Sequence, residues 1–164
     1  MATQLKNLSD FSATEIPSAT PYSFGIVVAE WNPEITNALY QGAYNSLLAN
    51  GALADNIQTY AVPGSFELTS GADLLLNNTG LDAIICLGCV IQGETRHFDF
   101  ICSAVANGLS NVAIKYSKPV IFGVLTTDNQ QQAIDRSGGK HGNKGDEAAI
   151  TAIKMADLAK TLER

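Results

Sequence analysis

The chain has 164 residues, which is the size of one domain, because a second full domain would leave neither with a good core. Hydrophobic residues make up 46% of the sequence and charged residues 16%, so the composition excludes a disordered, collagen-like or low-complexity chain. Sixteen acidic against ten basic residues give a net charge of −6, which argues against nucleic acid as a partner, because binding to nucleic acid needs a cationic face.

Residues 1–21 are expected to form an N-terminal arm. They are rich in serine, threonine and asparagine, carry Pro17 and Pro21, and include few apolar residues. Two interpretations stay open: a disordered tail, or an arm that becomes ordered only against a neighbouring subunit. Residues 22–164 are predicted to form a single domain.

Segments typical of strands and of helices alternate after the arm. The sequence predicts strands over residues 24–31, 57–62, 83–91 and 119–125, of which the apolar runs 24–31 and 83–91 are expected to be buried. Helical periodicity and stop signals predict helices over residues 33–50, 65–76, 97–115 and 146–162, and a short helix that ends at residue 135. Asn32 is expected to cap the first helix, and Thr127 or Asp128 the short one. A glycine-rich loop over residues 137–145 is expected to precede the last helix.

Strands that alternate with helices predict an α/β fold with a parallel sheet covered on both faces. We expect a flavodoxin-like, three-layer α/β/α sandwich around a four-stranded parallel sheet. In such sheets, ligands bind beyond the carboxyl ends of the strands, where the strand order reverses. A site is therefore expected in the segments that follow Val28, Val62, Val90 and Leu125.

The first two strands end in residues that suit a planar, polar ligand. Trp31, the single tryptophan, is either a half-buried packing residue or a stacking surface for a ring. Ser65 follows a turn forced by Pro63 and Gly64, where free backbone N–H groups could pair with the polar edge of a heterocycle. Glu67 is either an acid favoured by the helix dipole or a ligand contact.

The third strand leads into a loop that suits an anion and a proton transfer. Gly93 would let the backbone come close to a ligand, and Thr95 with the N–H groups of the next helix would cradle an anion. His97 is one of two histidines, and imidazole transfers protons near neutral pH. A structural histidine and a catalytic one are both compatible with this position.

A basic cluster follows the fourth strand. Arg136, Lys140, His141 and Lys144 lie within nine positions of an acidic chain. They are either a solvated surface patch or a site for a small anion, for which arginine suits phosphate in both geometry and charge.

Several motif matches are rejected. Cys86 and Cys89 have the C-x-x-C spacing of a redox or zinc pair, but residues three apart in a strand point to opposite faces. The glycine-rich loop lacks the Gly-Lys-Ser/Thr of a phosphate-binding P-loop, and no Gly-x-Ser-x-Gly elbow occurs. No metal site is therefore predicted.

The sequence also predicts a cytoplasmic protein that does not enter a membrane. The longest apolar run, residues 83–90, is too short to span a bilayer, and residues 1–20 lack the apolar stretch of a signal peptide. The three cysteines are odd in number and lie in apolar surroundings, as reduced thiols do. From the residues alone we expect an enzyme that acts, without a metal, on a phosphorylated small molecule and a planar ring.

Five segments in the same order resemble the lumazine synthase family, and the resemblance covers residues 24–156. The segments are residues 25–32 (GIVVAEWN), 62–68 (VPGSFEL), 87–99 (LGCVIQGETRHFD), 119–127 (PVIFGVLTT) and 132–145 (QAIDRSGGKHGNKG). The resemblance implies the penultimate step of riboflavin biosynthesis, a transferase reaction without cofactor or metal. It joins 5-amino-6-(D-ribitylamino)uracil to 3,4-dihydroxy-2-butanone 4-phosphate, and 6,7-dimethyl-8-ribityllumazine, phosphate and water are the products.

The same resemblance implies a role for each site residue. His97 would move protons, and the phosphate would lie at Glu94, Thr95 and Arg136. The pyrimidine and its ribityl chain would be held by Trp31, Ser65, Phe66, Glu67, Cys89, Val90, Ile91, Phe122 and Lys144. Phe122, Arg136 and Lys144 would come from the adjacent subunit, which requires a homo-oligomer with shared sites.

Relatives in this family occur as pentamers or as icosahedral shells of twelve pentamers, a 60-mer. The compact segment over residues 137–145 favours the shell, and riboflavin synthase is a candidate partner. Two residues depart from the family pattern. Glu94 stands where a small residue is usual, so only its backbone is expected to meet phosphate, and Trp31 stands where phenylalanine is frequent.

Two other functions stay open on the same fold. One is a non-catalytic protein that binds a flavin or lumazine. The other is a structural shell protein whose pocket has lost its use.

Overall fold

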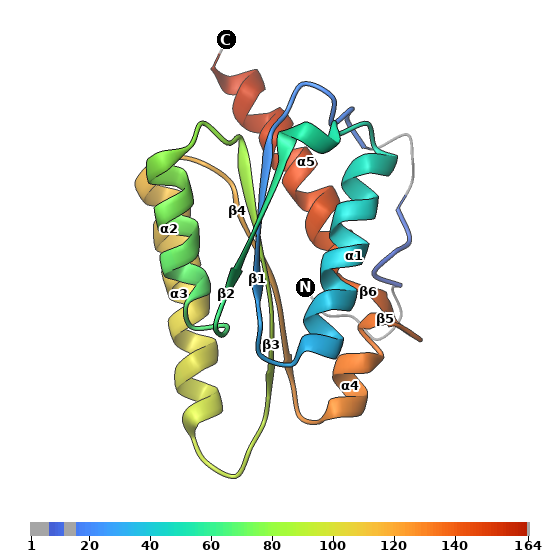
Figure 1. Ribbon diagram of the computed structural model, residues 1–164, viewed down its shortest axis with the longest axis vertical. Helices are drawn as coiled ribbons and strands as arrows, with labels where there is room; N and C mark the ends of the chain where they lie inside the picture. Colours follow the sequence, from blue (N-terminus) through green and yellow to red (C-terminus); the bar gives the residue numbers. More distant parts are fainter. Residues whose placement is uncertain (1–6, 12–15, 164) are drawn as a thin grey trace.

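Four parallel strands form the central sheet of the computed structural model, which describes residues 7–11 and 16–163. They are β1 (Phe24–Ala29), β2 (Ile57–Val62), β3 (Ala83–Ile91) and β4 (Val120–Thr127), in the order β2-β1-β3-β4 across the sheet. Helices α2 (Leu68–Asn78) and α3 (His97–Tyr116) cover one face, and α1 (Pro33–Ala49) and α5 (Lys144–Leu162) cover the other (Figure 1). The predicted three-layer α/β fold is confirmed.

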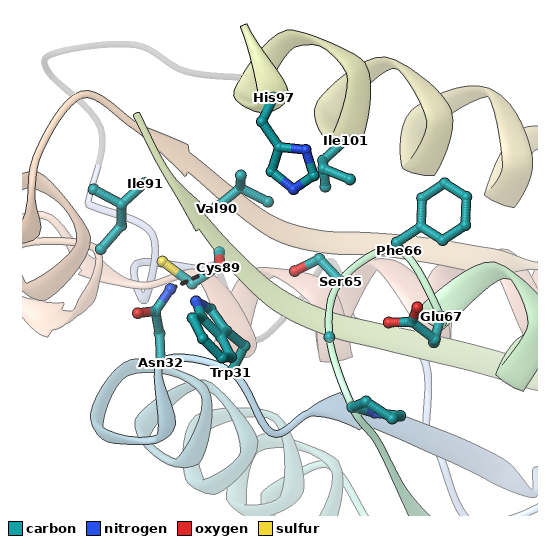
Figure 2. Close-up of a pocket in the computed structure, with 12 residues that line it drawn as sticks. Trp31, Asn32, Ser65, Phe66, Glu67, Cys89, Val90, Ile91, His97 and Ile101 are labelled. Atoms are coloured by element: carbon teal, nitrogen blue, oxygen red, sulfur yellow. Dashed lines mark hydrogen bonds between the residues drawn. The ribbon is translucent and has the colours of Figure 1, made fainter. Parts of the chain in front are cut away.

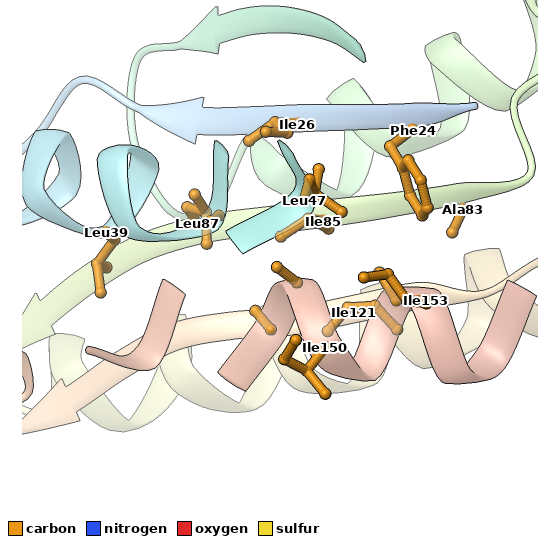
Figure 3. Close-up of a cluster of buried hydrophobic side chains, with 14 of the residues drawn as sticks. Phe24, Ile26, Leu39, Leu47, Ala83, Ile85, Leu87, Ile121, Ile150 and Ile153 are labelled. Atoms are coloured by element: carbon orange, nitrogen blue, oxygen red, sulfur yellow. The ribbon is translucent and has the colours of Figure 1, made fainter. Parts of the chain in front are cut away.

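Each face of the sheet carries its own hydrophobic core, because side chains alternate along a strand. In β1, Phe24 and Ile26 face α1 and α5, whereas Val27 faces α2 and α3. The larger cluster joins β1, β3 and β4 to the periodic apolar positions of α1 and α5 (Figure 3). Burying one such aliphatic side chain contributes roughly 1.5–3 kcal/mol. Cys86 and Cys89 lie in opposite clusters, which confirms that their spacing is structural.

The predicted apolar face of α1 is confirmed, because Ile35, Leu39, Ala43 and Leu47 are all buried. Helix α5 packs against α1 so closely that a Cβ at Gly145 would meet the carbonyl oxygen of Leu39. Only glycine fits at this contact.

The structure corrects the bounds of several elements. Helix α2 begins at Leu68, not at residue 65. The residues before it form a tight turn, in which the N–H of Glu67 donates to the carbonyl of Gly64 and the N–H of Leu68 donates to the carbonyl of Ser65. Strand β1 ends at Ala29, and β4 continues to Thr127.

Neither Thr127 nor Asp128 caps the short helix α4 (Gln130–Ile134). Asn129 does so, by accepting a hydrogen bond from the backbone N–H of Gln132 at 3.0 Å. The position of the cap was therefore wrong by one or two residues, although its chemistry was right.

Residues 137–145 are not an irregular loop. Strands β5 (Ser137–Gly139) and β6 (Gly142–Asn143) pair antiparallel in this segment. Helix α5 then begins at Lys144, two residues earlier than predicted, because the Asn143 side chain accepts a hydrogen bond from the N–H of Gly145 at 2.8 Å.

The described parts of the expected N-terminal arm lie against this same chain. Ala19 is completely buried, and its N–H donates to the carbonyl of Asn50 at 2.9 Å. The N–H of Leu8 donates to the carbonyl of His141 at 2.8 Å, and Ser9 Oγ accepts from the N–H of Asn143 at 2.9 Å. Residues 1–6 and 12–15 lie outside the described residues, and contact of the arm with a neighbouring subunit stays a prediction.

Within the described part of the chain, no helix is both long and apolar enough to cross a membrane.

Candidate active site

A cavity of about 650 Å³ opens at the carboxyl edge of the sheet, where the strand order reverses between β1 and β3. The chain leaves β1 for α1 on one face of the sheet and leaves β3 for α3 on the other (Figure 1). This divergence creates the crevice in which doubly wound sheets bind ligands. Eight predicted site residues line the cavity: Trp31, Ser65, Phe66, Glu67, Cys89, Val90, Ile91 and His97.

Trp31 lies at the mouth of the cavity with 72% of its surface exposed (Figure 2). Backbone and side-chain hydrogen bonds hold both of its neighbours. The N–H of Glu30 donates to the carbonyl of Val62 at 2.8 Å, and Asn32 Nδ2 donates to the carbonyl of Cys89 at 3.0 Å. An indole held so openly beside a cavity is suited to stack on a planar ring.

Ser65 is the clearest sign that the cavity is built for a ligand. Its side chain is 6% exposed, and its Oγ has no hydrogen-bond partner within the described part of the chain. A buried hydroxyl without a partner costs free energy, so such groups are rare unless a ligand or water completes them. Figure 2 shows this hydroxyl pointing from the turn toward strand β3, where Cys89 and Val90 line the cavity.

Phe66 and Glu67 belong to the turn before α2. Phe66 is 55% exposed, and the Glu67 side chain makes no capping hydrogen bond to α2 although it stands at the cap position. Among the described residues, no backbone carbonyl accepts from the N–H groups of Ser65 or Phe66. The turn therefore offers a carboxylate and unpaired N–H donors to the cavity.

The end of β3 forms an apolar wall through Cys89, Val90 and Ile91. Burial raises the pKa of the Cys89 thiol to about 11, so this group stays neutral at physiological pH. A neutral, buried thiol behaves as a small apolar side chain rather than as a nucleophile.

His97 is the first residue of α3, and its imidazole extends into the cavity beside Ile101, one helical turn further on (Figure 2). Its backbone N–H donates to Thr95 Oγ1 at 3.4 Å. Glu94 and Thr95 are exposed in the loop before α3 and do not line the cavity of this single chain. Anion binding at the N-terminus of α3 stays a prediction.

Phe122, Arg136 and Lys144 are not brought to the cavity. Phe122 lies within β4 and is 37% exposed, whereas Lys144 Nζ pairs with Glu147 at 2.6 Å. The Arg136 guanidinium donates to the carbonyl of Gln132 at 3.0 Å and makes no ion pair with any described residue. Its positive charge is therefore not paired with a carboxylate of any residue that the structure describes.

Four further residues line the cavity that the sequence reasoning did not assign to it: Asn32, Pro63, Gly64 and Ile101. Ile101 could have been predicted, because it follows His97 by four residues on one helix and so lies on the same face. Asn32 was expected only as a helix cap, and the structure gives its side chain a different partner. Over residues 7–11 and 16–163, no group of three or more metal-ligating side chains occurs.

Comparisons with known proteins point to one family. The family model described as 6,7-dimethyl-8-ribityllumazine synthase matches residues 21–160. A protein of that name from Cytophaga hutchinsonii is 62% identical over 99% of this chain and 100% of its own length. Proteins of the same name from Parabacteroides distasonis and Flavobacterium johnsoniae are 52% and 54% identical, over 97% and 95% of this chain and 99% and 82% of their own lengths.

Proposed function

The chain belongs to the 6,7-dimethyl-8-ribityllumazine synthase family, and we propose that it catalyses the reaction for which the family is named. In this transferase reaction, 5-amino-6-(D-ribitylamino)uracil condenses with 3,4-dihydroxy-2-butanone 4-phosphate in riboflavin biosynthesis. The observation that carries the proposal is one cavity lined by the exposed Trp31 ring, by the His97 imidazole and by Ser65, whose hydroxyl has no partner among the described residues.

The pyrimidine would lie against Trp31, with its polar edge toward the turn before α2. Ser65 Oγ and the unpaired N–H groups of Ser65 and Phe66 suit carbonyl and hydroxyl oxygens, and the Glu67 carboxylate suits hydroxyls of the ribityl chain. Cys89, Val90 and Ile91 supply an apolar wall that excludes water from the ring.

The chemistry needs a group that both accepts and donates protons. The amine of the uracil attacks the butanone carbonyl, water leaves as the imine forms, phosphate is eliminated, and ring closure releases a second water. His97 is suited to these transfers, because its ring extends into the cavity and imidazole serves as acid and base near neutral pH. Its place at the N-terminus of α3 also puts it next to the expected phosphate site.

The phosphate site would be completed by a second subunit. The loop before α3 supplies Thr95 and the backbone of Glu94, and Arg136 of an adjacent copy would supply the cation. Arg136 lies outside the cavity of its own chain and has no ion-pair partner among the described residues, as this arrangement requires. Phe122 and Lys144 would reach the ring from the same neighbour. We therefore propose a homo-oligomer built from pentamers, with the 60-subunit shell as the favoured form.

We further propose that the enzyme works in the cytoplasm without a metal or cofactor. The assay that tests the function combines purified protein with both substrates in EDTA and follows the absorbance and green fluorescence of the lumazine. Product formation above the spontaneous rate, reduced by at least about 100-fold in His97→Ala, is expected. Binding of lumazine without turnover would support the non-catalytic carrier instead, and intact shells with neither property would support a structural protein.

A further inference from the structure

Asn32 has an unusual backbone for the residue before a helix. It lies in the left-handed region, with φ 59° and ψ 57°, and only Ser117 shares this property among the described residues other than glycine. A residue at this position normally has an extended backbone and caps the helix with its side chain. Asparagine is one of the few side chains that tolerate the left-handed region.

The Asn32 side chain does not cap α1. Its Nδ2 instead donates to the carbonyl of Cys89 at 3.0 Å, across the point where β1 and β3 separate. The backbone pairing of these strands ends at Val28 and Leu87. The side-chain amide therefore supplies a further link between β1 and β3, at the floor of the cavity (Figure 2).

Trp31 is consequently held between two fixed neighbours. On one side, the N–H of Glu30 is bound to the end of β2, through Val62. On the other side, Asn32 is bound to the end of β3, and its carbonyl accepts from the N–H groups of Ile35 and Thr36, both at 3.0 Å. Because 72% of the indole is exposed, its own packing restrains it little, and the backbone on either side must set its direction.

We infer that Asn32 is a positioning residue that orients the Trp31 ring over the cavity, through its left-handed backbone and its hydrogen bond to the carbonyl of Cys89. The inference rests on the proposed function only in one respect, which is the identity of the ligand ring that stacks on Trp31. Asn32 need not touch the substrate in order to act. Its effect on binding passes through Trp31.

Two substitutions separate the hydrogen bond from the backbone. Asn32→Gly keeps the left-handed conformation and removes the amide, whereas Asn32→Asp keeps the shape but places a carboxylate oxygen against the carbonyl of Cys89. Ser117→Gly is the matched control, because it changes the other left-handed residue, at the far end of α3 from His97. All three proteins are expected to fold, which circular dichroism and thermal unfolding check.

The first readout needs no ligand. Trp31 is the only tryptophan, so time-resolved fluorescence anisotropy of the free protein reports its ring alone. Both Asn32 variants are expected to gain a fast component of local motion, and Ser117→Gly is expected to match the original protein. Unchanged anisotropy in Asn32→Gly would overturn the inference, whatever reaction the protein catalyses.

The second readout is a double-mutant cycle on the affinity for 6,7-dimethyl-8-ribityllumazine, followed by the fluorescence of that compound. Asn32→Gly alone is expected to weaken lumazine binding by about threefold to tenfold. In the enzyme assay, KM for the uracil substrate should rise by a larger factor than kcat falls. In a Trp31→Ala background, the same substitution should have no further effect. Additive losses would show that Asn32 affects binding independently of Trp31 and would overturn the positioning role.

If no lumazine binds to the original protein, the proposed function fails, and the anisotropy still decides the role of Asn32.

Discussion

Ser65 and Gly88 approach each other so closely that a Cβ at residue 88 would lie 2.6 Å from Ser65 Oγ. The same Cβ would lie 3.0 Å from a methyl carbon of Leu68, the first residue of α2. A glycine inside the apolar strand β3 is thereby explained, since it lets the turn before α2 settle against the sheet. The buried Ser65 hydroxyl therefore lies directly against strand β3.

Gly88→Ala should therefore impair both the fold and the site. The backbone at residue 88 suits alanine, but the new methyl group would push the Ser65 hydroxyl away from its place. We expect a loss of about 1–3 kcal/mol in the free energy of unfolding, measured in urea, together with weaker binding of lumazine. Gly80→Ala is the control, because a Cβ there meets no atom within 4 Å. Equal behaviour of the two variants would contradict the proposed packing.

Ser65→Ala should weaken ligand binding without lowering the stability of the protein. Because Ser65 Oγ has no partner within the described part of the chain, removing it should leave the free energy of unfolding unchanged within about 0.5 kcal/mol, or raise it. Affinity for the lumazine should nevertheless fall by about threefold to tenfold, since a hydrogen bond to the ligand is lost.

The matched control for Ser65→Ala is Thr127→Val. Thr127 Oγ1 is the other buried hydroxyl without a partner among the described residues, and it does not line the cavity. Its replacement should change neither stability nor affinity appreciably. A clear loss of stability in Ser65→Ala would mean that the hydroxyl serves the fold, and the hydrogen bond to the ligand would lose its support.

Gly93→Ala tests whether the loop before α3 approaches a ligand. A Cβ at Gly93 would meet no atom within 4 Å in the free chain, so thermal unfolding should not change. If the backbone there closes on phosphate, the methyl group should raise KM for the phosphorylated substrate and leave KM for the uracil almost unchanged. Equal KM values in the variant and the original protein would show that the phosphate lies elsewhere.

The reactivity of the thiols should follow their burial. The pKa of Cys89 is raised to about 11, and burial also raises the pKa of Cys86 and of Cys102. A group with a raised pKa stays protonated further up the pH scale, so at pH 8 about one Cys89 in a thousand is a thiolate. Iodoacetamide at that pH should leave Cys86 and Cys89 unmodified in native protein and label all three cysteines in guanidinium, as read by peptide mass mapping. Rapid labelling of Cys89 would contradict its role as an apolar wall.

The sequence was sufficient for the sheet because β1, β3 and β4 are largely apolar runs. The edge strand β2 is exposed over most of its length, but its segment was also predicted, so each of the four became a strand. Helix ends were less predictable, since they depend on particular hydrogen bonds. Asn143 caps α5 with its side chain, and Asn129 caps α4, but asparagine and glycine in residues 137–145 also suit an open loop. Nothing in the local pattern distinguishes these outcomes.

Some residues of the site could likewise be predicted from the sequence, and others could not. The rule that ligands bind at the carboxyl edge led to Trp31, Ser65 and His97, because position along the chain is enough to place them. The Asn32 side chain was missed because its partner is the carbonyl of Cys89, which is distant in sequence. Arg136 lies outside the cavity of its own chain, so the role proposed for it would depend on a neighbouring subunit.

A mixture of two inactive variants tests whether the active site is shared between subunits. His97→Ala and Arg136→Ala should each lower activity strongly, and both should keep the stability of the original protein, because neither side chain is part of the buried core. If His97 and Arg136 of one site come from different subunits, a co-expressed mixture contains some sites in which both are intact. Equal, random mixing gives about a quarter of the original activity.

The alternative predicts no recovery, because a site built within one chain always carries one of the two defects. Different affinity tags on the variants, with sequential purification, ensure that only mixed oligomers are assayed, and mass spectrometry gives their ratio. Mixing His97→Ala with Ser65→Ala is the control, since both side chains line the cavity of one chain, so the mixture should show only the activity that the two separate variants contribute in the same ratio. Recovery in the first mixture alone would show that Arg136 acts in the site of an adjacent subunit. Activity as low as that of the separate variants would show that Arg136 and His97 of one site belong to the same chain.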